Sequence, residues 1–222
     1  MSVRQLAAAS GIPRSTTHRL VAELLEWGAL ERGTRGVRLG MKLFELGTLA
    51  PSPTSLREEA SPYLHTLSEV TRLTANLAIR EGDQIVYLEK IASPTLRVPH
   101  SRLGGRGSLH ATGLGKAILA FSRPHEVEPV LAGRLAAVTP KTITDPAALA
   151  SELATIKRSG VAFDVQESRV GLFCVAAPIR DAAGFAIAAV SVTGATALTQ
   201  AERFAPTVIA TARGIERQLA RR

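Results

Sequence analysis

The chain has 222 residues, a formal net charge of +8 and a pI near 10.5, and 45% of its residues are hydrophobic. This length allows a small domain and a larger one, or one large domain. The single cysteine, Cys174, excludes an intrachain disulfide and a paired-cysteine metal site, and no apolar run approaches the ~18 residues of a membrane span. The excess of basic over acidic residues suits a polyanionic partner. The N-terminus has no signal-peptide pattern, which predicts a cytoplasmic protein.

The first 26 residues predict two short helices joined by a tight turn. Ser2 and Gln5 have the spacing of a capping box, in which each side chain satisfies the other residue's free backbone amide. The chain can turn at Ser10-Gly11, and Pro13 has a backbone angle suited to the first turn of a second helix. This pattern is a helix-turn-helix, which usually binds DNA.

The second predicted helix, residues 13–26, has an apolar side and a polar side. Thr17, Leu20, Val21 and Leu24 share the apolar side with the proline at its start. Its N-terminal half instead carries short polar and cationic groups, which suit phosphate oxygens and base edges in a major groove. The residues predicted to contact DNA from this helix are Arg14, Ser15, Thr16, His18 and Arg19. An ordinary solvated amphipathic helix is the alternative.

Residues 29–40 predict a small β-hairpin with Gly33 and Gly36 at its tip. A narrow hairpin beside a reading helix is the wing of a winged helix-turn-helix, and cations on it contact the DNA backbone. The predicted wing cations are Arg32, Arg35 and Arg38. The alternative interpretation of these residues is a basic surface turn that does not contact DNA.

Apolar residues at helical spacing continue through residues 41–49, and Pro51-Ser-Pro53 then breaks the pattern at the expected domain boundary. A further amphipathic helix is predicted from residue 55 to about 72. The strands expected after it are 74–80 and 84–91, joined as a hairpin, and a short one at 95–98, followed by a Gly-rich loop at 103–109.

Four more helices and three more strands complete an α+β pattern with an antiparallel sheet. Thr112 is placed to cap a helix through residue 121, Pro124 to begin another, and Asp145-Pro146 to begin a third that ends at Gly160. The apolar positions of that third helix are Ala147, Leu149, Leu153 and Ile156. The remaining strands are expected at 161–164, 173–179 and 185–193, and a last helix from Thr199.

Four stretches together resemble the transcriptional regulators of the IclR (isocitrate lyase regulator) family, nearly end to end. They are residues 10–20 with the wing, residues 109–119, residues 160–164 with Glu167, and residues 171–181 followed by 188–194. The resemblance implies a winged helix-turn-helix domain at 1–40, a linker helix at 41–58 and a GAF-like effector domain at 59–222. It also implies a homodimer formed through the DNA-binding part, or a tetramer.

One departure from the family concerns the N-terminus. Family members carry a further helix before the sequence seen here, so we expect Leu6, Leu20 and Leu24 to be partly exposed and the polypeptide to start upstream. A degenerate DNA-binding domain in a protein that only senses a ligand is the alternative.

The resemblance also implies where a small effector binds, between the sheet and a Gly-rich helix start. The implied effector residues are Leu96, Gly113, Leu114, Asp164, Cys174, Ser191 and Thr193. Amides at a helix N-terminus suit a carboxylate, and hydroxyls two apart on a strand face the same side. We therefore expect an organic or aromatic acid. Phe173 could add an apolar contact, although the sheet face that it occupies is left open.

Each implied effector residue has a simpler structural explanation. Cys174 could be a buried small hydrophobe, Asp164 a local cap and Ser191 a partner for the backbone. A thiol-hydrolase triad of Cys174, His110 and Asp164 lacks a local nucleophile signature, so no enzyme is predicted.

No metal and no cofactor are predicted either. His65, His100 and His110 are too scattered along the chain to indicate a metal site. Residues 113–116 fail the P-loop spacing, because the position of its first glycine and the position after its lysine hold other residue types. The sequence thus predicts a DNA-binding transcriptional regulator whose operator affinity an organic acid modulates.

Overall fold

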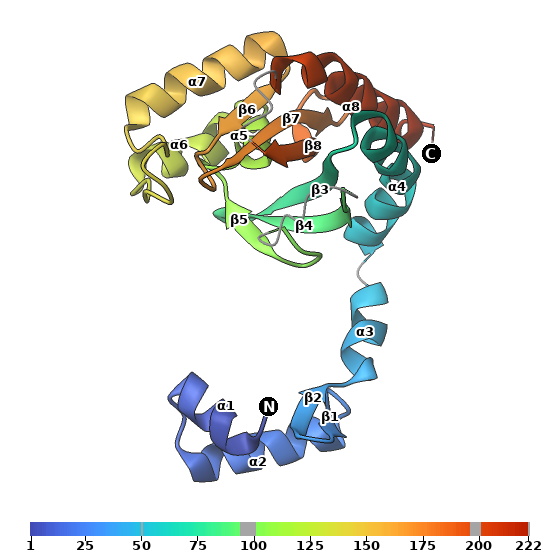
Figure 1. The fold of residues 1–222 in the computed structure, drawn as a ribbon, viewed down its shortest axis with the longest axis vertical. Helices are drawn as coiled ribbons and strands as arrows, with labels where there is room; N and C mark the ends of the chain where they lie inside the picture. Colours follow the sequence, from blue (N-terminus) through green and yellow to red (C-terminus); the bar gives the residue numbers. More distant parts are fainter. Residues whose placement is uncertain (50, 94–100, 196–200, 222) are drawn as a thin grey trace. The chain divides into compact units, whose positions relative to one another are not determined.

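The computed structural model describes residues 1–49, 51–93, 101–195 and 201–221. The chain divides into two compact units, Met1–Ser55 and Leu56–Arg222, which we call the N-terminal and C-terminal domains (Figure 1). The strand expected at 95–98 and the helix start expected at Thr199 lie outside the described residues, as does Leu96.

The N-terminal domain begins with two helices that turn sharply at a glycine. Ser2 and Gln5 form the predicted capping box, with Ser2 Oγ accepting from the Gln5 amide at 3.2 Å and Gln5 Oε1 accepting from the Ser2 amide at 2.8 Å. The first helix ends at Gly11, whose φ of +69° is costly for residues with a Cβ. The elements of this domain are α1 (Val3–Ser10), α2 (Arg14–Glu26), β1 (Leu30–Gly33), β2 (Gly36–Leu39) and α3 (Met41–Thr48).

Helix α2 begins one residue later than predicted, because Pro13 is its cap and keeps an extended ψ of 141°. Thr17 anchors this start, donating its hydroxyl to the carbonyl of Pro13 at 3.1 Å. Thr17 and Val21 are buried, whereas Leu20 and Leu24 are 37% and 39% exposed. The partial exposure expected of these two leucines is therefore confirmed.

The two-stranded hairpin of β1 and β2 has the predicted residues at its tip, with Gly33 opposite Gly36. Helix α3 follows after it, and α4 (Pro51–Thr71) begins at the prolines that the sequence suggested as a break. A proline lacks only an amide hydrogen that is unused in a first helical turn, so Pro51 starts the helix rather than interrupting it.

The C-terminal domain is built on one antiparallel sheet of six strands in the order β5-β4-β3-β8-β7-β6. The hairpin of β3 and β4 is confirmed, while the predicted Gly-rich loop contains the short edge strand β5. The strands are β3 (Thr74–Glu81), β4 (Gln84–Ile91), β5 (Arg106–Ser108), β6 (Ala162–Val165), β7 (Leu172–Arg180) and β8 (Ala186–Ala195).

The helices α5 and α7 of this domain begin at the capping residues that the sequence predicted. Thr112 Oγ1 accepts from the Gly115 amide at 3.0 Å, and Asp145 Oδ2 accepts from the Ala148 amide at 2.8 Å. Ala147, predicted to be part of an apolar face, is exposed. The helices after α4 are α5 (Gly113–Ala120), α6 (Pro124–Ala132), α7 (Pro146–Ser159), the short 3-10 helix η1 (Ala201–Phe204) and α8 (Ala205–Leu219).

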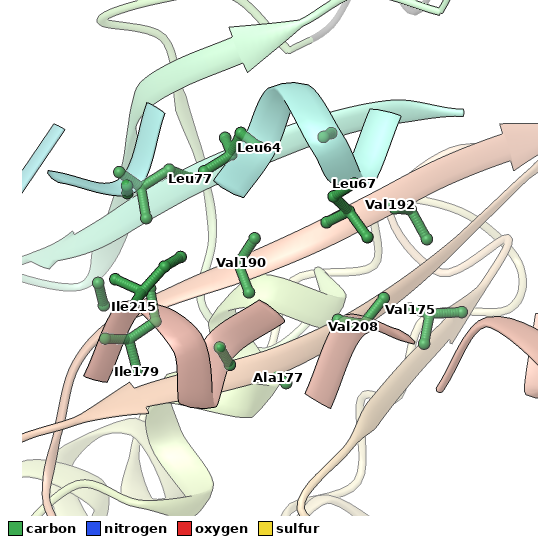
Figure 2. Close-up of a cluster of buried hydrophobic side chains, with 14 of the residues drawn as sticks. Leu64, Leu67, Leu77, Val175, Ala177, Ile179, Val190, Val192, Val208 and Ile215 are labelled. Atoms are coloured by element: carbon green, nitrogen blue, oxygen red, sulfur yellow. The ribbon is translucent and has the colours of Figure 1, made fainter. Parts of the chain in front are cut away.

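Each face of the sheet has its own hydrophobic core. On one face, side chains of α4 and α8 such as Leu64, Leu67 and Ile215 pack against Val190 and Val192 of β8 (Figure 2). On the other face, α5 packs over the alternate residues of the same strands, and α7 packs against α5. All eight residues of α5 are buried, so its N-terminus lies inside the domain.

Candidate DNA interface and effector site

The N-terminal half of α2 presents its polar groups to solvent. Arg14, Ser15, His18 and Arg19 are exposed, and Thr16 is half-buried. Arg19 lies 4.0 Å from Glu23 in a pair whose two side chains are more than half exposed, and such pairs are weak. These groups are therefore free to exchange water for phosphate or base edges.

The three wing arginines are all exposed, but one of them is engaged within the hairpin. Arg38 donates Nε and Nη2 to Glu31 Oε2 at 3.1 and 3.0 Å, while Glu31 Oε1 accepts from the Met41 amide at 2.9 Å. The amide hydrogen bond, followed by Arg38, lowers the pKa of Glu31. Arg32 and Arg35 remain as the outward cations of the wing.

The implied effector residues that the structure describes converge at the first turn of α5. Strand register places Asp164 opposite Cys174 and Cys174 opposite Thr193, so these three form a row across β6, β7 and β8. Gly113 sits over that row, since a Cβ on it would lie 3.1 Å from Cys174 Sγ. Leu114 lines the same small cavity.

The N-terminus of α5 leaves backbone amides directed away from the helix. Thr112 caps the amide of Gly115, so the amides of Gly113 and Leu114 precede the first capped donor and have no acceptor within the helix. The helix dipole adds positive potential at this end. The arrangement suits an anionic oxygen.

A second row of polar residues lies beside the first. Ser191 of β8 faces Asn76 of β3 and Ala176 of β7 in register. Asn76 Nδ2 is 3.5 Å from Ser191 Oγ and 3.4 Å from Thr193 Oγ1, both long for hydrogen bonds. The sequence interpretation missed Asn76, although a lone amide within an apolar strand was a signal that could have identified it.

Asp164 is committed to a local turn. Its Oδ1 accepts from the amides of Glu167 at 2.7 Å and Ser168 at 3.2 Å, and its Oδ2 accepts from the Ser168 hydroxyl at 2.5 Å. Burial raises the pKa of Asp164, and these hydrogen bonds oppose the rise. The capping role that the sequence left open for Asp164 is thus present in the structure.

A fully buried lysine lies one turn along α5 from Gly113. Lys116 Nζ donates to Glu167 Oε1 at 2.6 Å and to Glu152 Oε1 at 3.1 Å. Burial raises the pKa of Glu167 to about 6, because the nearby ammonium offsets only part of the lost hydration. The sequence interpretation also missed this pair, which a lysine in an apolar helix could have signalled.

The residues of the suggested hydrolase triad do not work together. His110 uses Nδ1 toward Ser108 Oγ at 2.9 Å and Nε2 toward the Ala136 carbonyl at 3.0 Å. Burial raises the pKa of Cys174 to about 12, so the thiolate needed for nucleophilic attack is disfavoured. With Asp164 held in its turn, this triad is not formed.

The space between these residues is small. A cavity of about 10 Å³ lies among Tyr87, Leu114, Asp164, Cys174 and Thr193, room for roughly one water molecule. The side chain of Phe173 packs on the opposite face of the sheet, where it stacks on Phe204 with ring centroids 6.0 Å apart. The question of its sheet face is therefore answered, and its ring is not among the polar groups of the site.

A larger hollow of about 620 Å³ lies elsewhere on the C-terminal domain, between the β3–β4 turn, α6 and residues 133–138. It is open, and Arg80 and His110 at its edge already bond to backbone carbonyls. It contains none of the implied effector residues. Convergent polar groups, rather than volume, make the α5 site the better candidate.

In the described part of the chain, His, Cys, Asp and Glu residues form no group of three or more that could hold a metal ion. Its helices are also too short or too polar to cross a membrane.

Comparison with known proteins gives the same assignment to both domains. The model of the IclR helix-turn-helix domain matches residues 1–33, and the model of the bacterial transcriptional regulator IclR C-terminal domain matches residues 50–217. The chain belongs to the IclR family. IclR-family membership makes it a DNA-binding transcriptional regulator and not an enzyme, with the helix-turn-helix as its DNA-binding element.

Two curated relatives illustrate the match. The HTH-type transcriptional regulator BhcR of Paracoccus denitrificans is 37% identical over 199 residues, which cover 88% of this chain and 71% of that relative. XynR of Escherichia coli is 33% identical over 194 residues, 86% of this chain and 77% of that relative.

Solved structures of IclR proteins extend the match to the whole fold. An IclR homolog from Microbacterium hydrocarbonoxydans, complexed with 4-hydroxybenzoate, has a TM-score of 0.92 and 32% identity, covering 100% of this chain and 92% of that chain. The Thermotoga maritima IclR has a TM-score of 0.83 and 30% identity, covering 99% and 91%.

Proposed function

We propose that an organic or aromatic acid binds at the first turn of α5 and thereby changes the affinity of this regulator for its operator. The observation that carries the proposal is the convergence of Gly113, Leu114, Cys174, Ser191 and Thr193, from three segments distant in sequence, on one buried polar site. A solved IclR homolog with bound 4-hydroxybenzoate supports an aromatic acid as the first candidate.

The acidic group of the ligand would bind to the amides of Gly113 and Leu114. Their position at a helix N-terminus provides both donors and positive potential. Thr193 and Ser191 would contact the rest of the ligand from the sheet, because both point to the α5 face.

Ligand binding at this site requires a conformational change. A cavity of about 10 Å³ cannot contain an organic acid, so the α5 end must separate from the sheet for the ligand to enter. A ligand shifts an equilibrium only when it binds one state more tightly than the other. A site that is closed without ligand and open with it meets this condition.

On DNA, Arg14, Ser15, Thr16, His18 and Arg19 would enter the major groove, and the wing cations Arg32 and Arg35 would contact phosphates. The test is fluorescence anisotropy of the 222-residue chain with the duplex upstream of its own gene, with an unrelated duplex as control. We expect selective, salt-sensitive binding that 4-hydroxybenzoate changes. Selective binding that no acid changes would refute the effector proposal, and ligand binding without DNA binding would favour the ligand-only sensor.

We further propose that two copies of the chain associate through α3 and the residues beside it. Leu39, Met41, Phe44 and Leu49 are between 61% and 74% exposed, an unusual concentration of bare apolar side chains. A second copy would cover them. Sedimentation analysis should find a dimer or tetramer for the natural chain and smaller species for Phe44→Glu, whereas a monomeric natural chain would refute this proposal.

A further inference from the structure

Asn76 belongs to the polar face beneath α5, and the fold leaves one end of its amide unsatisfied. Asn76 is 1% exposed, and its Oδ1 has no hydrogen-bond partner among the described residues. Leaving a buried amide oxygen unpaired costs about 1–3 kcal/mol. A residue with this cost is not explained by the stability of the fold.

The amide group as a whole is only loosely held. Its nitrogen approaches the hydroxyls of Ser191 and Thr193 at 3.5 and 3.4 Å, at the edge of hydrogen-bonding distance. Reversing the amide would direct its oxygen at the two hydroxyls and leave its nitrogen unpaired instead. In either orientation, one polar end of Asn76 lacks a partner.

The position of Asn76 relates this group to the proposed effector. Asn76 pairs in register with Ser191, and Thr193 lies diagonally across from it and next to Cys174. The α5 amides lie above Cys174, since Gly113 approaches its sulfur. Across the neighbouring strands β7, β8 and β3, the order is thus Cys174, Thr193 and Asn76, and the α5 amides lie at the Cys174 end of this row.

From this arrangement we infer that Asn76, together with the hydroxyls of Ser191 and Thr193, is a specificity-determining subsite for a hydroxyl group on the effector. The inference rests on the proposed function and names its ligand class: a hydroxy acid, whose acidic group binds the α5 amides and whose hydroxyl binds Asn76. A hydroxyl both donates and accepts, so it satisfies the amide in either orientation. An acid without the hydroxyl leaves Asn76 unpaired in the complex, as it is without ligand.

The test compares two acids that differ by one hydroxyl, 4-hydroxybenzoate and benzoate, by calorimetry on the natural chain and on Asn76→Leu. We expect the natural chain to bind 4-hydroxybenzoate about tenfold more tightly than benzoate, and Asn76→Leu to bind the two acids equally. Asn76→Ala, which cannot overfill the site, repeats the comparison if the leucine variant does not fold.

A second readout separates recognition from ordinary structural support. Because the amide is unsatisfied, ligand-free Asn76→Leu should melt at or above the temperature of the natural chain. Ser68→Ala is the matched control, since it deletes a buried polar group of the same domain whose hydroxyl bonds the Leu73 carbonyl at 2.8 Å. It should lower the melting temperature and leave the preference between the two acids unchanged.

The outcomes distinguish this inference from the proposal beneath it. Equal binding of both acids to the natural chain, or a preference that survives in Asn76→Leu, would overturn the hydroxyl subsite while acid sensing stands. If neither acid binds the natural chain, the acid-binding proposal fails for this class and the subsite fails with it.

Discussion

The two domains of this regulator hold their candidate functional groups in opposite ways. In the N-terminal domain, Arg14, His18 and Arg19 project from one helix into solvent, and neighbours in sequence are neighbours on the surface. In the C-terminal domain, Cys174 and Thr193 line a space of about 10 Å³ under α5, and Asn76 is buried beside Thr193. A surface that meets a large rigid partner can stay exposed, whereas a site for a small molecule must remove it from water.

The contrast predicts that removing a lysine charge lowers the free energy of unfolding by different amounts in the two domains. Lys116→Met should lower the free energy of unfolding by about 3–5 kcal/mol, because it leaves the buried carboxylate of Glu167 without its cation. The control is Lys42→Met, which removes an exposed pair with Glu45 at 3.2 Å and should cost less than about 1 kcal/mol. Urea unfolding monitored by circular dichroism measures both, and equal losses would contradict the contrast.

On the exposed side, the largest effect should be on DNA affinity rather than on stability. Arg19→Ala should weaken binding to the specific duplex by about 1–3 kcal/mol and reduce discrimination against an unrelated duplex. Arg158→Ala, an exposed arginine on α7, is the control and should leave both unchanged. Anisotropy titrations decide this, and an unchanged specificity ratio for Arg19→Ala would remove that residue from base recognition.

The buried acid should make the C-terminal domain sensitive to pH. The pKa of Glu167 is raised from 4.5 to about 6, so between these values the folded state binds more protons than the unfolded state. The free energy of unfolding should therefore fall as pH rises through this window, by up to about 2 kcal/mol from this group.

The variant Glu167→Gln isolates that contribution. The difference in unfolding free energy between the natural chain and Glu167→Gln should change between pH 4.5 and 6 and stay constant above about pH 7. A difference that is independent of pH would mean that folding does not shift the pKa of Glu167.

The smallest effect is expected at the wing. Because Arg38 is bonded to Glu31, Arg38→Ala should change the salt dependence of DNA binding less than Arg32→Ala or Arg35→Ala does. Each phosphate contact contributes a slope of about 0.9 in log K against log salt. Titrations from low to moderate salt measure the slopes, and equal changes for all three arginines would show that DNA displaces the Glu31 pair.

Local signals in the sequence predicted most of the elements correctly. The capping residues Ser2, Thr112 and Asp145 and the glycines at 11 and 160 mark ends that the structure confirms, because a helix end depends on a few adjacent residues. The pattern does break after α3, but α4 begins at Pro51 and not at residue 55 as predicted, because a proline that follows one helix can start the next.

Some candidate functional residues could be predicted from the local sequence pattern, and others depend on contacts with residues far away in the sequence. The α2 residues are exposed side chains of one amphipathic helix, and the period of its pattern was enough to identify them. The implied effector residues came from family resemblance, and that resemblance named neither Asn76 nor Lys116. Their importance depends on partners 115 and 51 residues away, and no local pattern indicates such distances.

By itself, the sequence determined the α+β class, the helix-turn-helix with its wing, the hairpin of β3 and β4, and the presence of a capped helix at α5. These follow from periodicity, capping and turn residues, all of which act over a few positions. Only the tertiary structure decided that Lys116 is paired inside the core, that Arg38 is engaged by Glu31, and that Asn76 is unsatisfied beneath α5. Burial, pairing and the loss of hydration depend on which segments meet, and that is a property of the packed chain.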